Sequence, residues 1–228
     1  MTRVLVTGAT GHIGANLVRD LLENDYEVVT FARETSSLLG LKGLDVEPAF
    51  GDILDRGSLR AAMEGCELVF HAGAVHANWA RDPDDLVRPA IIGTENALRA
   101  AKDAGVRRVV CTSSVAAVGY TDNGGSPYDE SHWNDGARSP YIRAKNDAER
   151  LAWKLSEELD LEVVTTCPCG VLGQLDYRMT PVSEAIVASM KGKGPVFAVM
   201  CLTDVRDVAR GHVLAMEKGR PGERYILG

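Results

Sequence analysis

The sequence predicts an α/β fold in which helices cover both faces of a doubly wound parallel sheet. Two observations predict it. Short runs of β-branched and other apolar residues alternate with helical stretches along almost the whole chain, which is the pattern of repeated strand–helix units. These strand runs are nearly continuous in apolar residues, as expected where neither face of a sheet meets water.

The predicted strands come first in each unit and are rich in Val, Leu and Phe. They are Val4–Thr7, Glu27–Phe31, Val46–Phe50, Glu67–His71, Arg108–Thr112 and Leu161–Cys167. The predicted helices that follow them are His12–Glu23, Gly57–Met63, Asp84–Ala104, Pro140–Leu159, Pro181–Lys191 and Val205–Lys218. The segment from Gly119 to Gly136 has no clear periodicity, and long loops in compact domains are often functional.

The start of the helix at Pro140 is marked by two signals. Ser139 can accept a hydrogen bond from the first turn through its hydroxyl, and proline at the first helical position has a suitable fixed φ. This predicts that Ser139 is the N-cap and that Tyr141 lies in the first helical turn.

The composition excludes several classes of protein. The chain has 228 residues, of which 45% are hydrophobic and 25% charged, as in an ordinary soluble domain. Its net charge of -7 argues against a general nucleic-acid or anionic-membrane partner. No apolar run approaches membrane-spanning length, and Arg3-Val4-Leu5-Val6 enters the fold without a signal peptide, so we expect a cytoplasmic protein.

Cysteine usage predicts no metal site. The close pair is Cys167-Pro168-Cys169, and no second pair completes a zinc-like set. Residues that lie two apart on a strand share a face, so a metal or redox role stays open. The favoured interpretation is that these are small apolar residues in or near buried strands.

A glycine-rich turn links the first predicted strand to the first predicted helix. Gly8, Gly11 and Gly14 allow a tight turn, a close approach of the backbone to a pyrophosphate, and close packing of helix on strand. This predicts a Rossmann-type dinucleotide site. Its predicted cofactor-binding residues are Gly8, Thr10, Gly11, His12, Ile13 and Gly14.

The end of the second strand predicts which cofactor binds there. A carboxylate at this point would bond the ribose 2′-hydroxyl of NAD and repel a 2′-phosphate. The chain instead has Phe31-Ala32-Arg33, and a guanidinium suits a phosphate. We therefore predict NADP(H), bound in part by Arg33; a solvated surface arginine is the alternative.

Tyr141 and Lys145 indicate what the bound dinucleotide is for. Four residues apart on a helix, their side chains share one face. A nearby ammonium favours the phenolate and so lowers the pKa of a tyrosine. Hydride delivery to a carbonyl builds negative charge on its oxygen, and a phenol held nearby can supply the neutralising proton.

These residues belong to an ordered set that resembles a known family. The set is the glycine turn, Gly51-Asp52-Ile53, His71-Ala72-Gly73-Ala74, Thr112-Ser113-Ser114, Tyr141-x-x-x-Lys145 and Asp204-Val205-Arg206-Asp207-Val208-Ala209. Together they resemble the extended short-chain dehydrogenases/reductases of the NAD-dependent epimerase/dehydratase superfamily. The stretches Arg88–Thr94 and Asp129–Asp135 are similar to the dihydroflavonol reductase and cinnamoyl-CoA reductase branch.

The resemblance implies a role for each matching residue. Tyr141 would be the general acid, Lys145 would hold the nicotinamide ribose and lower the pKa of the tyrosine, and Ser114 would bond the substrate oxygen, with Thr112 and Ser113 as adjacent alternatives. The further cofactor contacts it implies are Asp52 and Ile53 at the adenine, Ala72, Gly73 and Ala74 along the middle, Thr112, and Pro168 and Val171 at the nicotinamide amide.

Other polar and aromatic residues receive weaker assignments. The mechanism needs no histidine, so His71, His76, His132 and His212 are predicted to be structural. An apolar pocket is expected from Val75, Trp79, Trp133, Val171 and Leu172, although either tryptophan would serve equally well in packing.

The prediction is a Rossmann domain over residues 1–167 and a small, shortened substrate lobe over 168–228. Relatives continue beyond Gly228, so the chain is expected to be a naturally short member, a truncated reading frame or a sequence cut short. An apolar edge of the lobe would favour a homodimer. The predicted function is NADP(H)-dependent reduction of a small ketone or aldehyde, or the reverse; the alternatives are a nucleotide-sugar epimerase or dehydratase, and a dinucleotide-binding regulatory protein without turnover.

Overall fold

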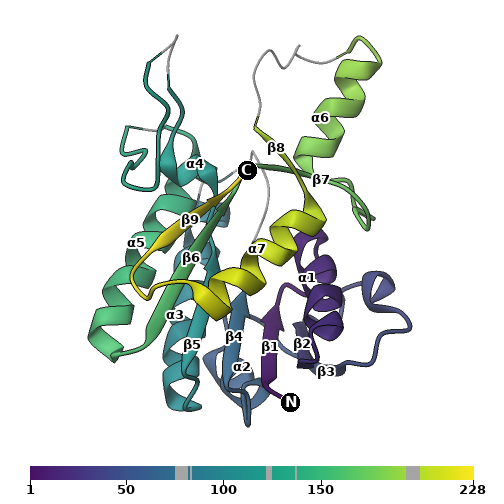
Figure 1. Ribbon diagram of the computed structural model, residues 1–228, viewed down its shortest axis with the longest axis vertical. Coiled ribbons are helices and arrows are strands. Elements are labelled where there is room, and N and C mark those ends of the chain that lie inside the picture. The colour runs from purple at the N-terminus through teal and green to yellow at the C-terminus, as the bar shows by residue number, and fades with distance from the viewer. Residues whose placement is uncertain (75–81, 83, 122–124, 137, 194–200) are drawn as a thin grey trace.

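The computed structural model describes residues 1–74, 82, 84–121, 125–136, 138–193 and 201–228 (Figure 1). A seven-stranded parallel sheet in the order β3-β2-β1-β4-β5-β6-β9 forms its centre. Its strands are β1 (Arg3–Thr7), β2 (Glu27–Ala32), β3 (Glu47–Phe50), β4 (Leu68–His71), β5 (Arg108–Thr112), β6 (Glu162–Pro168) and β9 (Arg224–Leu227). This confirms the predicted α/β class.

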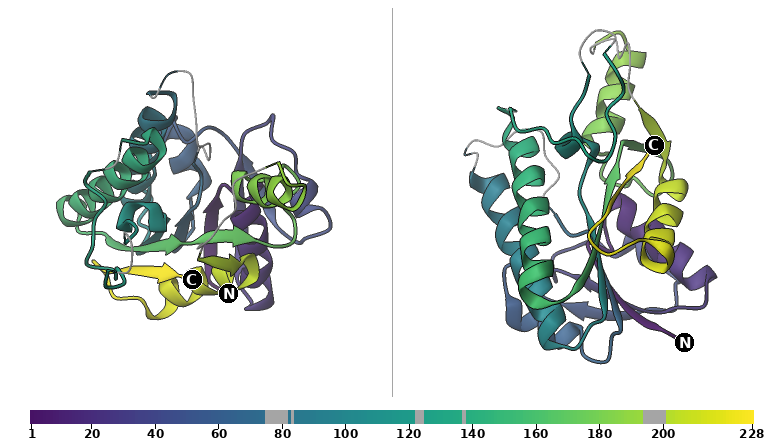
Figure 2. Two further views of the ribbon diagram at one scale, coloured as in Figure 1. Left: turned by 90° about the horizontal axis from the view of Figure 1, so that it is seen from above. Right: turned by 60° about the vertical axis from the view of Figure 1, so that its left-hand side comes forward.

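Helices cover both faces of the sheet, as the view from above shows (Figure 2). One face carries α2 (Arg56–Ala62), α3 (Asp84–Asp103) and α5 (Pro140–Leu159); the other carries α1 (His12–Glu23) and α7 (Val205–Lys218). Alternate strand residues supply the two cores: Leu5 of β1 packs with α2 and α3, whereas Val4 and Val6 pack with α1 and α7.

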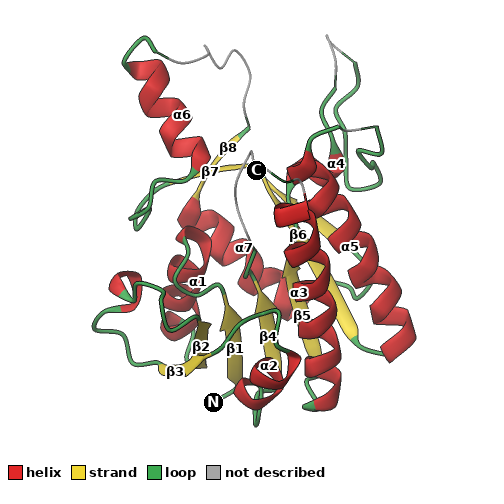
Figure 3. Ribbon diagram, turned by 180° about the vertical axis from the view of Figure 1, so that it is seen from behind, coloured by secondary structure: helices red, strands yellow, loops and turns green. Residues whose placement is uncertain are grey.

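A smaller unit lies above the sheet, beyond β6 (Figures 1 and 3). It contains the two-stranded parallel sheet of β7 (Gly170–Leu172) and β8 (Leu202–Asp204), with α6 (Pro181–Met190) beside it. The chain then returns to the main sheet through α7 and β9, where Thr165–Pro168 of β6 pairs with Arg224–Leu227. The region 168–228 therefore contributes both to the small unit and to the main sheet.

The predicted strands and helices are all present, with shifts of one residue at some ends. The short strands β7, β8 and β9, the one-turn helix α4 (Val115–Val118) and the 3₁₀ helix η1 (Leu39–Leu41) were not predicted. One prediction about α5 is wrong: Ser139 occupies the N-cap position, but its hydroxyl accepts no capping hydrogen bond. Pro140 has no N–H to satisfy, so this helix end needs less capping than others.

The carboxyl ends of all the main strands meet at one edge, the upper edge in Figure 1. Chain order reverses between β1 and β4, and in doubly wound sheets ligands bind in the crevice at this switch point. The described helices include none long and apolar enough to cross a membrane. Across the described residues, no three His, Cys, Asp or Glu side chains are grouped to hold a metal ion.

Candidate active site

The glycine turn between β1 and α1 is packed so tightly that side chains are excluded. Gly8 has a φ of +69°, and a Cβ there would lie 2.7 Å from the backbone of Ala72. A Cβ at Gly14 would lie 2.1 Å from the Gly8 carbonyl oxygen. Gly11 begins α1 as its N-cap and donates its N–H to Gly8 O at 2.9 Å. The turn therefore brings the amino end of α1 close to the ends of β1 and β4.

The same turn has the properties of an anion site. The first turn of α1 carries no acidic side chain, and both ring nitrogens of His12 are buried without a hydrogen-bond partner in the described structure. A helix N-terminus attracts negative charge through its free N–H groups. Orphaned ring nitrogens beside such a terminus fit a dinucleotide pyrophosphate. The neighbouring Thr10 and Ile13 lie half-buried in the same turn.

The residues predicted to bind the 2′-phosphate and the adenine lie at the ends of β2 and β3. Arg33 directly follows β2, is exposed, and forms no ion pair within the part of the chain that is described. Asp52 accepts the Leu54 N–H at 2.9 Å through Oδ1. Ile53 packs against Gly93 of α3, where a Cβ would lie 2.8 Å from the isoleucine Cδ1. Arg33, Asp52 and Ile53 thus lie at the edge of the sheet where the glycine turn lies.

The chain after β4 passes directly beside the glycine turn. Gly73 donates its N–H to the Thr7 hydroxyl at 3.0 Å, and that hydroxyl lies 3.0 Å from His71 Nδ1. A pocket runs from Gly73 and Ala74 to Lys145 along the ends of β4 and β5. The predicted middle contacts, Ala72 to Ala74, therefore line the route between the glycine turn and the end of β5.

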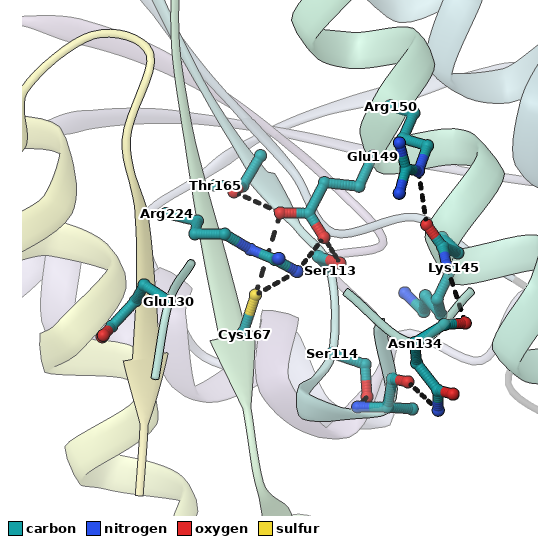
Figure 4. Close-up of polar contacts among 12 residues, drawn as sticks. Ser113, Ser114, Glu130, Asn134, Lys145, Glu149, Arg150, Thr165, Cys167 and Arg224 are labelled. Carbon is teal, nitrogen blue, oxygen red and sulfur yellow. Dashed lines mark hydrogen bonds and ion pairs between the residues drawn. The ribbon is translucent and has the colours of Figure 1, made fainter. Parts of the chain in front are cut away.

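Ser114, Tyr141 and Lys145 meet at the carboxyl end of β5. Ser114 is the N-cap of α4 and accepts the Ala116 N–H at 3.1 Å. Its hydroxyl donates a hydrogen bond to the phenol of Tyr141, in the first turn of α5. One turn further, Lys145 Nζ donates to the carbonyl oxygen of Thr112 at 3.1 Å. The predicted trio is brought together by the end of one strand and the start of one helix; Figure 4 shows two of its members, Ser114 and Lys145.

Burial and hydrogen bonding set the protonation of these groups. Burial raises the pKa of Tyr141, and the hydrogen bond from Ser114 opposes that rise by favouring the phenolate. Burial lowers the pKa of Lys145, and Glu149 is first among the groups that oppose this by favouring the ammonium. In this structure the neighbour that acts on the Tyr141 pKa is Ser114, while Lys145 contacts the backbone of β5.

The predicted nicotinamide contacts and pocket walls are dispersed. Pro168 ends β6, and Val171 and Leu172 lie half-buried in β7. The Trp133 ring lies beneath the guanidinium groups of Arg150 and Arg224, whose Cζ atoms are 4.3 and 4.1 Å from its centroid. Trp133 is therefore held by packing. Val75, His76 and Trp79 lie outside the described residues.

The described histidines form hydrogen bonds within the protein, His12 excepted. His132 bonds Asp129 Oδ1 at 2.8 Å on the surface. Beneath the site, His212 donates from Nδ1 to the Val208 carbonyl at 2.8 Å and accepts at Nε2 from the hydroxyls of Thr112 and Thr166, each at 2.9 Å. These contacts agree with structural roles.

All five cysteines are free, and Cys167 and Cys169, which lie two apart in the sequence, contact different partners. Cys167 is buried against Glu149, at 3.9 Å from Oε1. Cys169 instead forms a hydrogen bond with Cys201, the residue that precedes β8. Burial is the largest cause that raises the pKa of Cys167 and of Cys169 to about 12.

A family model described as "NAD dependent epimerase/dehydratase family" matches residues 4–228. The chain belongs to this family. A putative dihydroflavonol 4-reductase from Synechocystis is 38% identical over 231 residues, covering 98% of this chain and 66% of that protein. Cinnamoyl-CoA reductase 1 from Petunia hybrida is 36% identical over 243 residues, covering 98% of this chain and 71% of that protein. The resemblance to this branch of the family is confirmed.

Solved structures of family members share the fold. Yeast methylglyoxal/isovaleraldehyde reductase Gre2, complexed with NADPH, matches with a TM-score of 0.85 and 26% identity, over 100% of this chain and 78% of that one. The dTDP-glucose 4,6-dehydratase DesIV from Streptomyces venezuelae, with NAD bound, matches with a TM-score of 0.85 and 26% identity, over 100% and 76%. This chain spans about two thirds of the length of the Synechocystis relative.

The candidate site contains two buried residues that the sequence analysis did not identify. Glu149 lies on α5 and accepts the Ser113 hydroxyl at 2.5 Å, and Arg224 of β9 reaches the same carboxylate at 2.8 Å. Glu149 follows Lys145 by four residues, so the spacing that joined Tyr141 to Lys145 could have found it. Arg224 had no such signal, because only the pairing of β9 with β6 brings it near.

Proposed function

We propose that this chain is an NADP(H)-dependent oxidoreductase that reduces a small aldehyde or ketone to an alcohol, or catalyses the reverse. The observation that carries the proposal is the meeting of Ser114, Tyr141 and Lys145 at the end of β5, on the edge where the glycine turn lies. An acid beside a dinucleotide site is the arrangement that carbonyl reduction needs. The reductase names of its relatives support the same class.

The chain's own residues would hold the cofactor along the sheet edge. The amino end of α1 and His12 would bind the pyrophosphate, and Lys145 and the phenol of Tyr141 would bind the nicotinamide ribose. Lys145 uses one N–H for Thr112 O, which leaves two for a ribose hydroxyl. When bound, NADPH supplies the hydride. Pro168 and Val171 would border the reacting end.

Ser114 and Tyr141 would act on the substrate oxygen. The Ser114 hydroxyl would turn its single proton from Tyr141 to that oxygen when substrate binds, and Tyr141 would donate its phenolic proton as negative charge develops there. In the reverse direction the phenolate accepts the proton of the alcohol. The bond from Ser114 to Tyr141 stabilises the phenolate left after donation, which offsets the cost of its burial.

Arg33 supports the choice of NADP(H). Its guanidinium is exposed at the end of β2 and has no acidic partner in the described structure. A free guanidinium can form charge-assisted hydrogen bonds with a 2′-phosphate. The Gre2 complex contains NADPH, while DesIV contains NAD, so the family uses both cofactors and the arginine is the deciding residue in this proposal.

The small unit of β7, β8 and α6 is proposed to form the substrate lobe. Val171 and Leu172 of β7 would supply an apolar wall near the reacting end. The exposed Tyr177, Met179 and Met190 add apolar surface to the small unit. A small, partly apolar carbonyl compound fits these surroundings better than a charged one.

The test is NADPH consumption with a panel of aldehydes and ketones, using wild type, Tyr141→Phe and the matched control Tyr26→Phe. Tyr26 directly precedes β2, at the amino ends of the strands, and bonds Glu217. In Tyr141→Phe, loss of the general acid should lower kcat by ~10²- to 10⁴-fold. The control should keep a kcat near that of wild type. Equal activity of Tyr141→Phe and wild type would contradict the proposed role.

The alternatives predict different results in this assay. Conversion of a nucleotide sugar without net NADPH consumption would support an epimerase or dehydratase. Tight binding of NADPH with no turnover of any substrate, unchanged by Tyr141→Phe, would support a dinucleotide-binding regulatory protein.

A further inference from the structure

A buried ion pair lies directly behind the proposed catalytic residues. The Glu149 carboxylate of α5 and the Arg224 guanidinium of β9 are 2.8 Å apart, with side chains only 1% and 6% exposed. Moving two charges out of water is costly, and a well-packed apolar pair of similar volume often stabilises a fold at least as much as a buried ion pair does. The position of this pair, rather than its strength, therefore requires an explanation.

Glu149 connects the two strands that end at the site (Figure 4). Its Oε2 accepts the Ser113 hydroxyl at 2.5 Å, and its Oε1 accepts the Thr165 hydroxyl at 2.7 Å. Ser113 also donates its N–H to Thr166 O at 2.8 Å. The carboxylate thus fixes the end of β5 against β6 at the residue that immediately precedes Ser114.

Arg224 holds the carboxylate and extends the network outward. Its Nη1 donates to the carbonyl oxygen of His132 at 2.9 Å, and its guanidinium lies over the ring of Trp133. The next residue, Asn134, donates from Nδ2 to Ala116 O of α4 at 3.0 Å. The loop around residues 132–134 is therefore tied to the helix that Ser114 caps.

Lys145 lies one helical turn before Glu149 on the same face of α5. Burial removes water from its ammonium and lowers its pKa, while the proposed reaction uses that charge. Glu149 is the carboxylate that the network supplies to offset this, and Arg224, Ser113 and Thr165 all donate hydrogen bonds to it.

We propose that Glu149, held by Arg224, is a positioning residue of the active site: it keeps Lys145 charged and fixes the strand end that presents Ser114. This inference rests on the proposed function for the role of the trio. It predicts that neutralising Glu149 changes the site in a way that neutralising a comparable carboxylate elsewhere does not.

Other titratable groups face Lys145 and Glu149 from the surrounding elements. They are Cys111 of β5, Cys167 of β6, Arg224 of β9, His71 of β4 and His212 of α7. Burial lowers the pKa of both histidines to about 4 and raises the pKa of both thiols to about 12, so all four are neutral near pH 7. Among the groups that act on the pKa of Lys145, Glu149 is therefore the carboxylate that favours its ammonium most.

The direct test follows the Lys145 ammonium by NMR as a function of pH, with lysine-labelled protein and the signal assigned by its absence in Lys145→Arg. In Glu149→Gln the titration midpoint of Lys145 should fall by about one pH unit relative to wild type, because one neighbouring anion is removed. The control is Glu162→Gln, which neutralises a carboxylate paired with Arg108 at the opposite ends of the same two strands. Its midpoint should match wild type.

A second variant keeps the test informative if Glu149→Gln does not fold. Glu149→Gln combined with Arg224→Met leaves no buried guanidinium unpaired, and the midpoint should fall there too, because Glu149 heads the groups that favour the Lys145 ammonium. An unchanged midpoint in both Glu149 variants, or an equal fall in Glu162→Gln, would overturn the proposal.

Kinetics separate this inference from the proposed function. In the NADPH assay, Glu149→Gln should lower kcat about tenfold or more while the KM for NADPH changes less than about threefold, and the alkaline limb of the kcat profile should move to lower pH. If wild type turns over no carbonyl compound but the Lys145 midpoint still falls in Glu149→Gln, the reductase function is refuted. The role of Glu149 in keeping Lys145 charged is then still supported. Normal kcat and pH profile in Glu149→Gln would refute the positioning role alone.

Discussion

The two histidines buried beneath the sheet edge predict how the protein responds to acid. His71 and His212 are 6% and 0% exposed, and burial lowers the pKa of each from 6.5 to about 4. His212 accepts hydroxyl protons from Thr112 and Thr166 at Nε2. A protonated ring cannot accept these hydrogen bonds. Protonation of His212 is therefore unfavourable in the native state, whereas the histidines of the unfolded chain bind protons freely.

The magnitude follows from the native and unfolded pKa values. In the unfolded chain a histidine titrates near pH 6.5, so between pH 6.5 and about 4 the unfolded state binds more protons than the native state. Stability is then complete above pH 6.5 and decreases as the pH falls through this window. A tenfold change in proton affinity corresponds to about 1.4 kcal/mol, so each histidine contributes about 3 kcal/mol across the window.

Urea unfolding measured from pH 7.5 to pH 4 tests this reasoning in wild type and in His212→Asn. The substitution has its own cost, but that cost is nearly independent of pH, so the comparison concerns the change in stability across the window. The part of this loss that the two buried histidines cause should be roughly halved in the variant, because His71 is the one that remains. A wild-type free energy of unfolding that stays flat across this window, or a variant with the same slope as wild type, would refute it.

Three further changes test other parts of the structure. Gly14→Ala places a Cβ 2.1 Å from a carbonyl oxygen and should weaken NADPH binding at least ~10-fold by displacing α1, as measured by fluorescence titration, while Gly136→Ala, where nothing lies within 4 Å, should not. Arg33→Ala should reduce the ratio of kcat/KM for NADPH over NADH by about 10-fold, the effect of one lost charge-assisted contact; an unchanged ratio would remove Arg33 from the cofactor site. Leu98→Ala in the buried face of α3 should lower the free energy of unfolding by about 2–5 kcal/mol in urea titrations, and a loss below about 1 kcal/mol would contradict its place in the core.

The parts that could be predicted from sequence are those decided by local rules. The tight turn at Gly8 and Gly14 follows from positions where a side chain would overlap the backbone. The joint placement of Tyr141 and Lys145 follows from helical periodicity. The strands β1, β2, β4, β5 and β6 are mainly apolar runs buried on both faces, so composition alone marks them.

The parts that could not be predicted depend on distant pairing. β7 and β8 have three residues each and no buried side chain, so no apolar run marks them. β9 forms only through its pairing with β6, and the same pairing buries Arg224. Ser139 shows a different failure: the residue type and position suit a cap, but the hydroxyl is not used.

Lys145 shows how local spacing and distant packing combine at one atom. The spacing from Tyr141 correctly places it on the site-facing side of α5, yet spacing carries no information about its charge. Burial lowers the pKa of Lys145, and Glu149, which is held by Arg224 from the far end of the sequence, opposes this by favouring the ammonium. A proton-transfer site works only in the correct protonation state, so under the proposed function the last strand of the sheet would support the chemistry without touching the reacting atoms.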